Sequence, residues 1–121
     1  MLRKPKKILV IAPHPDDDVL GVGGTISRFS EDGVEVSVLI ISGHLPPLYD
    51  KQSFLKTKAE AKQSFKIMKV SNWEFFEIPA TTIHEMPVAT LNSKISNFLT
   101  FTNPDWVFIP FPDRHIDHRT V

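Results

Sequence analysis

Residues 7–18 read KILVIAPHPDDD, and this stretch decides the fold. Its first half carries Ile, Leu and Val with no polar residue between them, which predicts a strand that is buried on both faces. Such strands are typical of parallel sheets that helices cover on both sides. A histidine and three adjacent aspartates follow the strand. Because neighbouring carboxylates repel one another, we expect a divalent metal ion to hold this cluster together.

The rest of the chain repeats the strand pattern and places helices between the strands. Three further apolar runs are predicted to be buried strands: 35–42, 73–79 and 106–112. Helical patterns lie within 18–33, 53–70 and 90–105, and 79–89 is expected to be a loop. The first helix should end before Gly33 and the third before Pro104.

This alternation of strands and helices predicts an α/β fold. We expect a Rossmann-like three-layer sandwich with a mainly parallel sheet and right-handed crossovers. In such sheets, ligands bind beyond the carboxyl ends of the strands, where the winding reverses. A strand order of 3-2-1-4 would place the first and fourth strands side by side at that point.

The composition limits the classes of function. The 121 residues suit one domain, and 14 basic residues balance 14 acidic ones, which argues against a broad phosphate-contacting face for nucleic acid. The chain has no cysteine, so any zinc must bind to histidine and carboxylate. No apolar stretch approaches the roughly 18 residues of a membrane span. The basic and then apolar start lacks the cleavage site of a signal peptide, so we expect a cytoplasmic protein.

A second polar cluster follows the fourth strand as the first cluster follows the first strand. It reads PDRHIDHRTV over residues 112–121. If the two strands are neighbours, both clusters converge in one crevice at the strand ends. The converging side chains would be His14, Asp16, Asp17, Asp18, Asp113, His115, Asp117 and His118.

These residue types favour a catalytic metal site, in which three protein ligands leave one position open. His14 and Asp17 lie three residues apart across a turn, and His118 supplies the third ligand. Zn²⁺ suits imidazole and carboxylate, with Fe²⁺, Mn²⁺ and Co²⁺ as alternatives. Asp16 is left free to act as a general base toward a water molecule that the metal activates.

The remaining histidine and aspartate of the second cluster complete a hydrolytic site. His115 would polarise or protonate a substrate oxygen, and Asp117 would orient His115.

Taken together, the two motifs resemble the signatures of the PIG-L/LmbE-like zinc deacetylases. PHPDDD with the following GVGGTI is similar to the first signature, and HIDH is similar to the second. The resemblance covers nearly the whole chain and implies a single deacetylase domain over 1–121 that acts on N-acetylglucosamine-type sugars or their conjugates. It also implies a role for each matching residue: His14, Asp17 and His118 as metal ligands, Asp16 as general base, His115 at the oxyanion and Asp117 as its orienting partner.

The sequence departs from the family pattern in several places. The family usually has Glu where this chain has Asp18 and Pro where it has Ile116. We expect Asp18 to keep a supporting role with a shorter reach. An arginine that contacts substrate in many members is replaced by lysines in KTKAEAK. Family chains also run well beyond the HIDH motif, so we expect these residues to be the N-terminal part of a longer protein.

Several alternatives stay open at the level of sequence. Aspartates at a helix start also serve as caps. His44, directly after the second strand, is either a plain loop residue or a substrate contact. A sugar-binding family member without turnover would keep the same motifs. A magnesium-dependent phospho-receiver is a weaker alternative, because the third strand ends EIPATT without the aspartate that such a domain phosphorylates. The expected partner is a small N-acetylated amino sugar, and a homo-oligomer is compatible with that function.

Overall fold

The computed structural model describes residues 2–121. Its helices and strands alternate along the chain. They are β1 (Lys7–Ala12), α1 (Asp17–Glu31), β2 (Glu35–Gly43), α2 (Lys51–Ile67), β3 (Asn72–Pro79), the 3₁₀ turn η1 (Ile83–Glu85), α3 (Val88–Thr102), β4 (Trp106–Phe108) and α4 (Ile116–Thr120).

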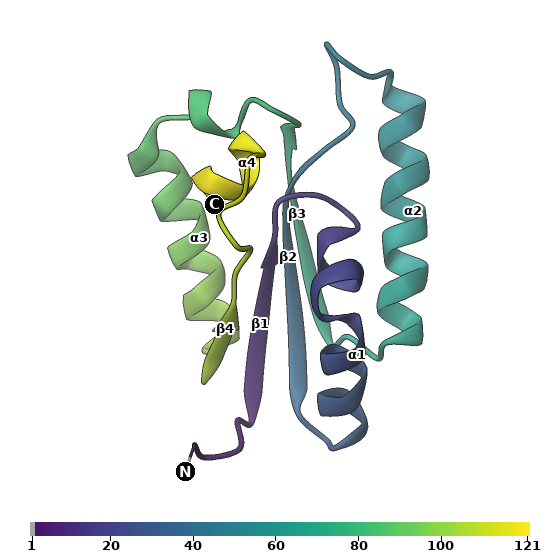
Figure 1. Cartoon of the computed structure of the whole chain (residues 1–121), viewed down its shortest axis with the longest axis vertical. Coiled ribbons are helices and arrows are strands. Elements are labelled where there is room, and N and C mark those ends of the chain that lie inside the picture. The colour runs from purple at the N-terminus through teal and green to yellow at the C-terminus, as the bar shows by residue number, and fades with distance from the viewer. Residues whose placement is uncertain (1) are drawn as a thin grey trace.

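The predicted fold class and strand order are confirmed. The four strands are parallel and form one sheet in the order β3-β2-β1-β4. Helices α1 and α2 lie on one face of the sheet, and α3 and α4 lie on the other (Figure 1). The carboxyl ends of β1 and β4 are therefore neighbours. Among residues 2–121, no helix combines the length and the apolar character needed to cross a membrane.

Alternate residues of β1 contribute to two apolar cores, one on each face of the sheet. Ile8 and Val10 pack with Phe65 of α2, and Leu9 packs with Phe98 of α3. Both faces are covered at the two central strands, β1 and β2, which explains why these strands show no polar alternation. The prediction of buried strands is wrong for β3 and β4, which lie at the two edges of the sheet and are only partly covered: Trp73 and Val107 are each 42% exposed.

The helix ends follow the predicted stop signals. Gly33 has a φ of 81°, in the left-handed region, which glycine adopts without a steric clash because it has no Cβ. Its N–H donates to the carbonyl of Ser30. Asn103 ends α3 with a φ of 45°, directly before Pro104. Each turn directs the chain into the next strand.

β4 is shorter than the sequence predicted. The apolar run suggested a strand over 106–112, whereas only Trp106–Phe108 pairs with β1. Pro110 and Pro112 have no N–H for a strand ladder, so pairing stops before them. The chain is then free to turn and to bring the second polar cluster over the end of β1.

Candidate metal centre

Two polar segments meet at the carboxyl end of the sheet. One is the loop from β1 into the first turn of α1, and the other is α4 with the residues just before it (Figure 1). β1 pairs with β4, so the topology delivers both segments to the same place. Asp17 Oδ2 accepts a hydrogen bond from the backbone N–H of His14 at 3.0 Å, which fixes the turn between these two residues.

His14, Asp17 and His118 each offer one donor atom to a common space. The three atoms lie within 4.8 Å of one another. Asp17 Oδ2 is 3.3 Å from His14 Nδ1 and 3.2 Å from His118 Nε2. A tetrahedral ion with bonds of about 2.0–2.1 Å separates its ligand atoms by about 3.3 Å. The donor types and these two spacings fit Zn²⁺ or a similar divalent ion.

The second ring nitrogen of His14 is held by a buried carboxylate. His14 Nε2 lies 2.7 Å from Asp117 Oδ2, and Asp117 has no exposed surface. The same oxygen accepts the backbone N–H of Thr81 at 2.7 Å. A carboxylate that accepts the N–H of an imidazole fixes the tautomer and orientation of the ring. Nδ1 of His14 then keeps its lone pair for a cation.

His118 has a matching carboxylate on its far side. His118 Nδ1 lies 2.9 Å from Asp113 Oδ2, and Asp113 Oδ1 accepts the backbone N–H of His115 at 2.8 Å. A proton on Nδ1 satisfies this contact and leaves the lone pair of Nε2 directed toward Asp17 Oδ2. Each of the two imidazoles in the donor set is therefore oriented by its own carboxylate.

His14, His115 and Asp117 form a second group of potential ligands. This group suits a cation less well, because Asp117 Oδ2 already accepts hydrogen bonds from a backbone amide and from His14. His115 stacks on His118 with ring centroids 5.0 Å apart and is less buried than the other histidines of the site. The first group is therefore the better suited of the two to hold a cation.

Asp117 contacts a different histidine from the one expected. Its carboxylate was expected to orient His115, but Asp117 Oδ2 lies 4.0 Å from His115 Nδ1. The backbone N–H of Asp117 donates to that nitrogen instead, at 3.1 Å, so His115 acts as the N-cap of α4. Because Nδ1 accepts this bond, the proton of a neutral His115 ring sits on Nε2. His115 is thus oriented as a donor through its Nε2–H.

The charges of the site favour a cation. Burial acts most strongly on both His14 and Asp17 and opposes their charged forms, yet contacts within the cluster outweigh it. The hydrogen bonds to Asp17 and Asp117 raise the pKa of His14. The hydrogen bond to His14 and the charge of His118 lower the pKa of Asp17. Asp17 therefore stays ionised and attracts positive charge.

The other predicted site residues belong to neither donor group. Asp16 is exposed at the start of α1. Asp18 is only 1% exposed, and burial raises its pKa to about 6, so its carboxyl group lies inside the fold. His44 is exposed and stacks on Tyr49, with ring centroids 4.1 Å apart and an interplanar angle of 27°.

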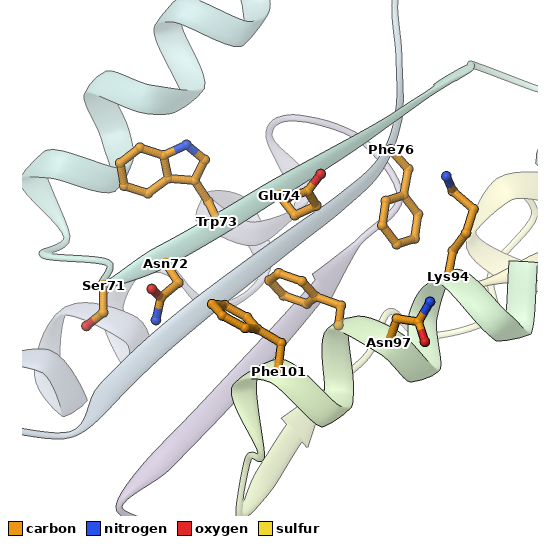
Figure 2. A pocket seen from close by; sticks show the side chains of 9 residues that line it. Ser71, Asn72, Trp73, Glu74, Phe76, Lys94, Asn97 and Phe101 are labelled. Atoms are coloured by element: carbon orange, nitrogen blue, oxygen red, sulfur yellow. The ribbon is translucent and has the colours of Figure 1, made fainter.

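Cavity volume alone does not mark this site. A cavity of about 240 Å³ adjoins Asp17 between β1 and residues 108–111. A groove of about 660 Å³ lies elsewhere, between β3 and α3 (Figure 2). Its walls include Phe76, Phe101 and Lys94, and Glu74 is its single carboxylate. The groove contains no histidine, so it offers no comparable set of metal ligands.

Sequence reasoning missed the contribution of Thr81. This residue lies in the loop after β3, and its contact with Asp117 uses the backbone N–H rather than the side chain. Every residue except proline carries such a group, so the sequence contains no signal for this contact.

Several known proteins are similar to this chain in sequence. A family model described as PIG-L, GlcNAc-PI de-N-acetylase, matches residues 9–121. A diacetylchitobiose deacetylase of Thermococcus kodakarensis is 29% identical in an alignment of 131 positions, gaps included, that covers 94% of this chain and 45% of that protein. A probable N-acetyl-alpha-D-glucosaminyl L-malate deacetylase 2 of Bacillus cereus is 25% identical and covers 94% of this chain and 56% of that protein.

Solved structures show the same fold. The N,N'-diacetylchitobiose deacetylase from Pyrococcus horikoshii superposes with a TM-score of 0.84 at 30% identity, over 97% of this chain and 46% of that one. The chain thus spans about half the length of the relatives that it matches.

Proposed function

The chain belongs to the PIG-L family, and we propose that it is a cytoplasmic, metal-dependent hydrolase that removes the N-acetyl group from an N-acetylglucosamine-type sugar or sugar conjugate. The observation that carries this proposal is the donor set of His14, Asp17 and His118, with Asp17 Oδ2 3.3 and 3.2 Å from the two imidazole nitrogens. The relatives named as deacetylases of N-acetylated sugars support the substrate class.

His14, Asp17 and His118 would hold the ion, with Zn²⁺ as the first candidate and Fe²⁺, Mn²⁺ or Co²⁺ as alternatives. When bound, such an ion supplies Lewis-acid chemistry, which activates water near neutral pH and polarises a carbonyl. Asp113 and Asp117 would orient the two imidazoles through the ring nitrogens that do not face the ion: Asp113 Oδ2 lies 2.9 Å from His118 Nδ1, and Asp117 Oδ2 lies 2.7 Å from His14 Nε2.

The remaining steps use side chains of this chain. Asp16 takes a proton from the attacking water molecule as a C–O bond forms at the acetamide carbon. The Nε2–H of His115 donates a hydrogen bond to the carbonyl oxygen, on which negative charge develops. The C–N bond then breaks, and the proton held by Asp16 passes to the leaving amine. The products are acetate and the free amino sugar.

The exposed pair of His44 and Tyr49 is proposed to contact the sugar. Both residues belong to the segment that follows β2, at the same end of the sheet as the donor set. Their rings are stacked face to face with centroids 4.1 Å apart, so each ring supports the other and offers its outer face as a flat surface. Such a surface can cover the apolar face of a sugar ring without taking part in the reaction.

An acetate-release assay tests the proposal. The metal-loaded protein is incubated with a panel of N-acetylated amino sugars that includes N-acetylglucosamine and N,N'-diacetylchitobiose. We expect acetate from at least one of them, and none from His118→Ala. His84→Ala is the matched control, because His84 is an exposed histidine outside both donor groups. Metal binding without acetate from any sugar would instead indicate a binding role without turnover.

A further inference from the structure

The turn after β3 has an unusual backbone conformation. Thr81 has a φ of 68°, in the left-handed region. A residue branched at Cβ rarely adopts this region, because its Cβ lies too close to the following carbonyl oxygen. Such strain persists only where the surrounding structure imposes it, and it is concentrated at functional sites.

Contacts on both sides of Thr81 impose this conformation. The N–H of Ala80 donates to the carbonyl of Gly43 at the end of β2, at 2.9 Å. Thr82 binds the carbonyl of Pro79 through its N–H at 3.2 Å and through its hydroxyl at 2.7 Å. The peptide between these anchors has little freedom to rotate.

The constrained peptide points its N–H at the metal centre. It donates to Asp117 Oδ2 at 2.7 Å, the same oxygen that lies 2.7 Å from His14 Nε2. Asp117 belongs to a helix of five residues, α4, and a helix this short does not hold its own conformation in water. The position of the carboxylate therefore depends on contacts outside α4.

We propose that Thr81 is a positioning residue of the metal centre. Its backbone N–H, which the contacts of Ala80 and Thr82 hold in place, fixes the buried carboxylate of Asp117, and Asp117 holds the ring of His14 in the orientation that binds the ion. The effect on turnover rests on the proposed function, whereas the effect on metal binding does not.

Removal of the N–H separates positioning from ordinary structural support. The α-hydroxy acid analogue of threonine at position 81 turns this peptide into an ester and leaves Asp117 Oδ2 without its backbone donor. The Zn²⁺ dissociation constant of the ester variant should rise about 10-fold, the lower end of the loss seen when partners of ligating histidines are changed. Thr81→Gly keeps the N–H and adopts a φ of 68° without strain, so it should bind Zn²⁺ as the wild type does, and the melting temperature of its metal-free form should stay equal or rise. A purely structural role predicts a lower melting temperature in the ester variant with an unchanged affinity.

Two further variants serve as controls. Thr81→Val keeps a branched side chain at the strained position and should retain the affinity of the wild type. Lys69→Gly releases the same kind of strain, since Lys69 has a φ of 56°, but it lies between α2 and β3, at the opposite end of the sheet. It should bind Zn²⁺ as the wild type does.

Hydrogen exchange measured by NMR on the metal-free protein gives a second readout. Asp117→Ala removes the acceptor and should speed the exchange of the Thr81 amide, while the Ala80 amide, which donates to Gly43, keeps its protection. Unchanged Zn²⁺ affinity in the ester variant at position 81, or unchanged Thr81 exchange in Asp117→Ala, would overturn the proposal. If the wild type binds Zn²⁺ but releases no acetate, the proposed function fails, and these two measurements still decide the role of Thr81.

Discussion

His118→Ala tests the metal centre most directly. The substitution removes Nε2, which lies 3.2 Å from Asp17 Oδ2 and is one of the three proposed ligand atoms. Four ligands of a structural zinc site together contribute about 10–16 kcal/mol, so one of them corresponds to about 3 kcal/mol. The Zn²⁺ dissociation constant should therefore rise by a factor of about 100 or more.

A graded comparison strengthens this test. Asp113→Asn leaves the ligand in place and changes only the group 2.9 Å from its Nδ1, so the loss should be smaller, about 10-fold. His84→Ala should bind as the wild type does, because His84 is exposed and belongs to neither donor group. The loss of Zn²⁺ affinity should therefore be largest in His118→Ala, smaller in Asp113→Asn and absent in His84→Ala.

Affinity is measured by competition between metal-free protein and a chromophoric chelator. Thermal unfolding gives an independent reading, because an ion that binds only the folded state stabilises it. With Zn²⁺ at 100 times the wild-type dissociation constant, the wild type should gain about 2.7 kcal/mol and His118→Ala only about 0.4 kcal/mol. Full zinc occupancy in a protein that carries both His14→Ala and His118→Ala would refute the assignment of the site.

Three further predictions concern turnover, substrate binding and stability. Asp16→Asn should keep the metal but lower kcat by about 100-fold, as expected for loss of a general base; loss of the metal instead would mean that Asp16 is a ligand. His44→Ala and Tyr49→Ala should raise KM for the sugar with little change in kcat, and steady-state kinetics that show only a lower kcat would contradict a sugar contact. Asp105 accepts two backbone N–H groups at 2.6 and 3.0 Å, which lower its pKa. It therefore contributes stability above its unfolded pKa of about 3.9, and this is lost as the pH falls through the lower folded value. Asp105→Asn should flatten the dependence of the melting temperature on pH below about 4, and an unchanged acid profile would count against the contact.

The fold could be predicted because the decisive signals are local and point to one topology. Four apolar runs without polar alternation indicated buried parallel strands, and the helical patterns between them left a doubly wound sheet as the consistent solution. That topology also explains why two polar clusters about a hundred residues apart meet, since β1 and β4 are neighbours in the sheet. The length of β4 was overestimated because Pro110 and Pro112 are compatible with an apolar pattern but not with strand pairing.

The hydrogen-bond partners of the histidines in the site were harder to predict, and helix geometry explains why. The motif HIDH places His115 and Asp117 two positions apart, which suggests a direct contact in an extended chain. Side chains two positions apart on a helix do not face each other. Once α4 forms, the carboxylate of Asp117 turns into the fold, where a backbone amide and His14 Nε2 supply its hydrogen bonds.

The structure gives His115 and Asp117 of the HIDH motif different partners. Asp117 Oδ2 lies 2.7 Å from His14 Nε2, and Asp113 Oδ2 lies 2.9 Å from His118 Nδ1. His115 is left with a backbone amide on Nδ1 and its proton on Nε2. The two carboxylates therefore orient the two imidazoles of the donor set, whereas His115 is oriented by a backbone amide and presents its Nε2–H as a donor.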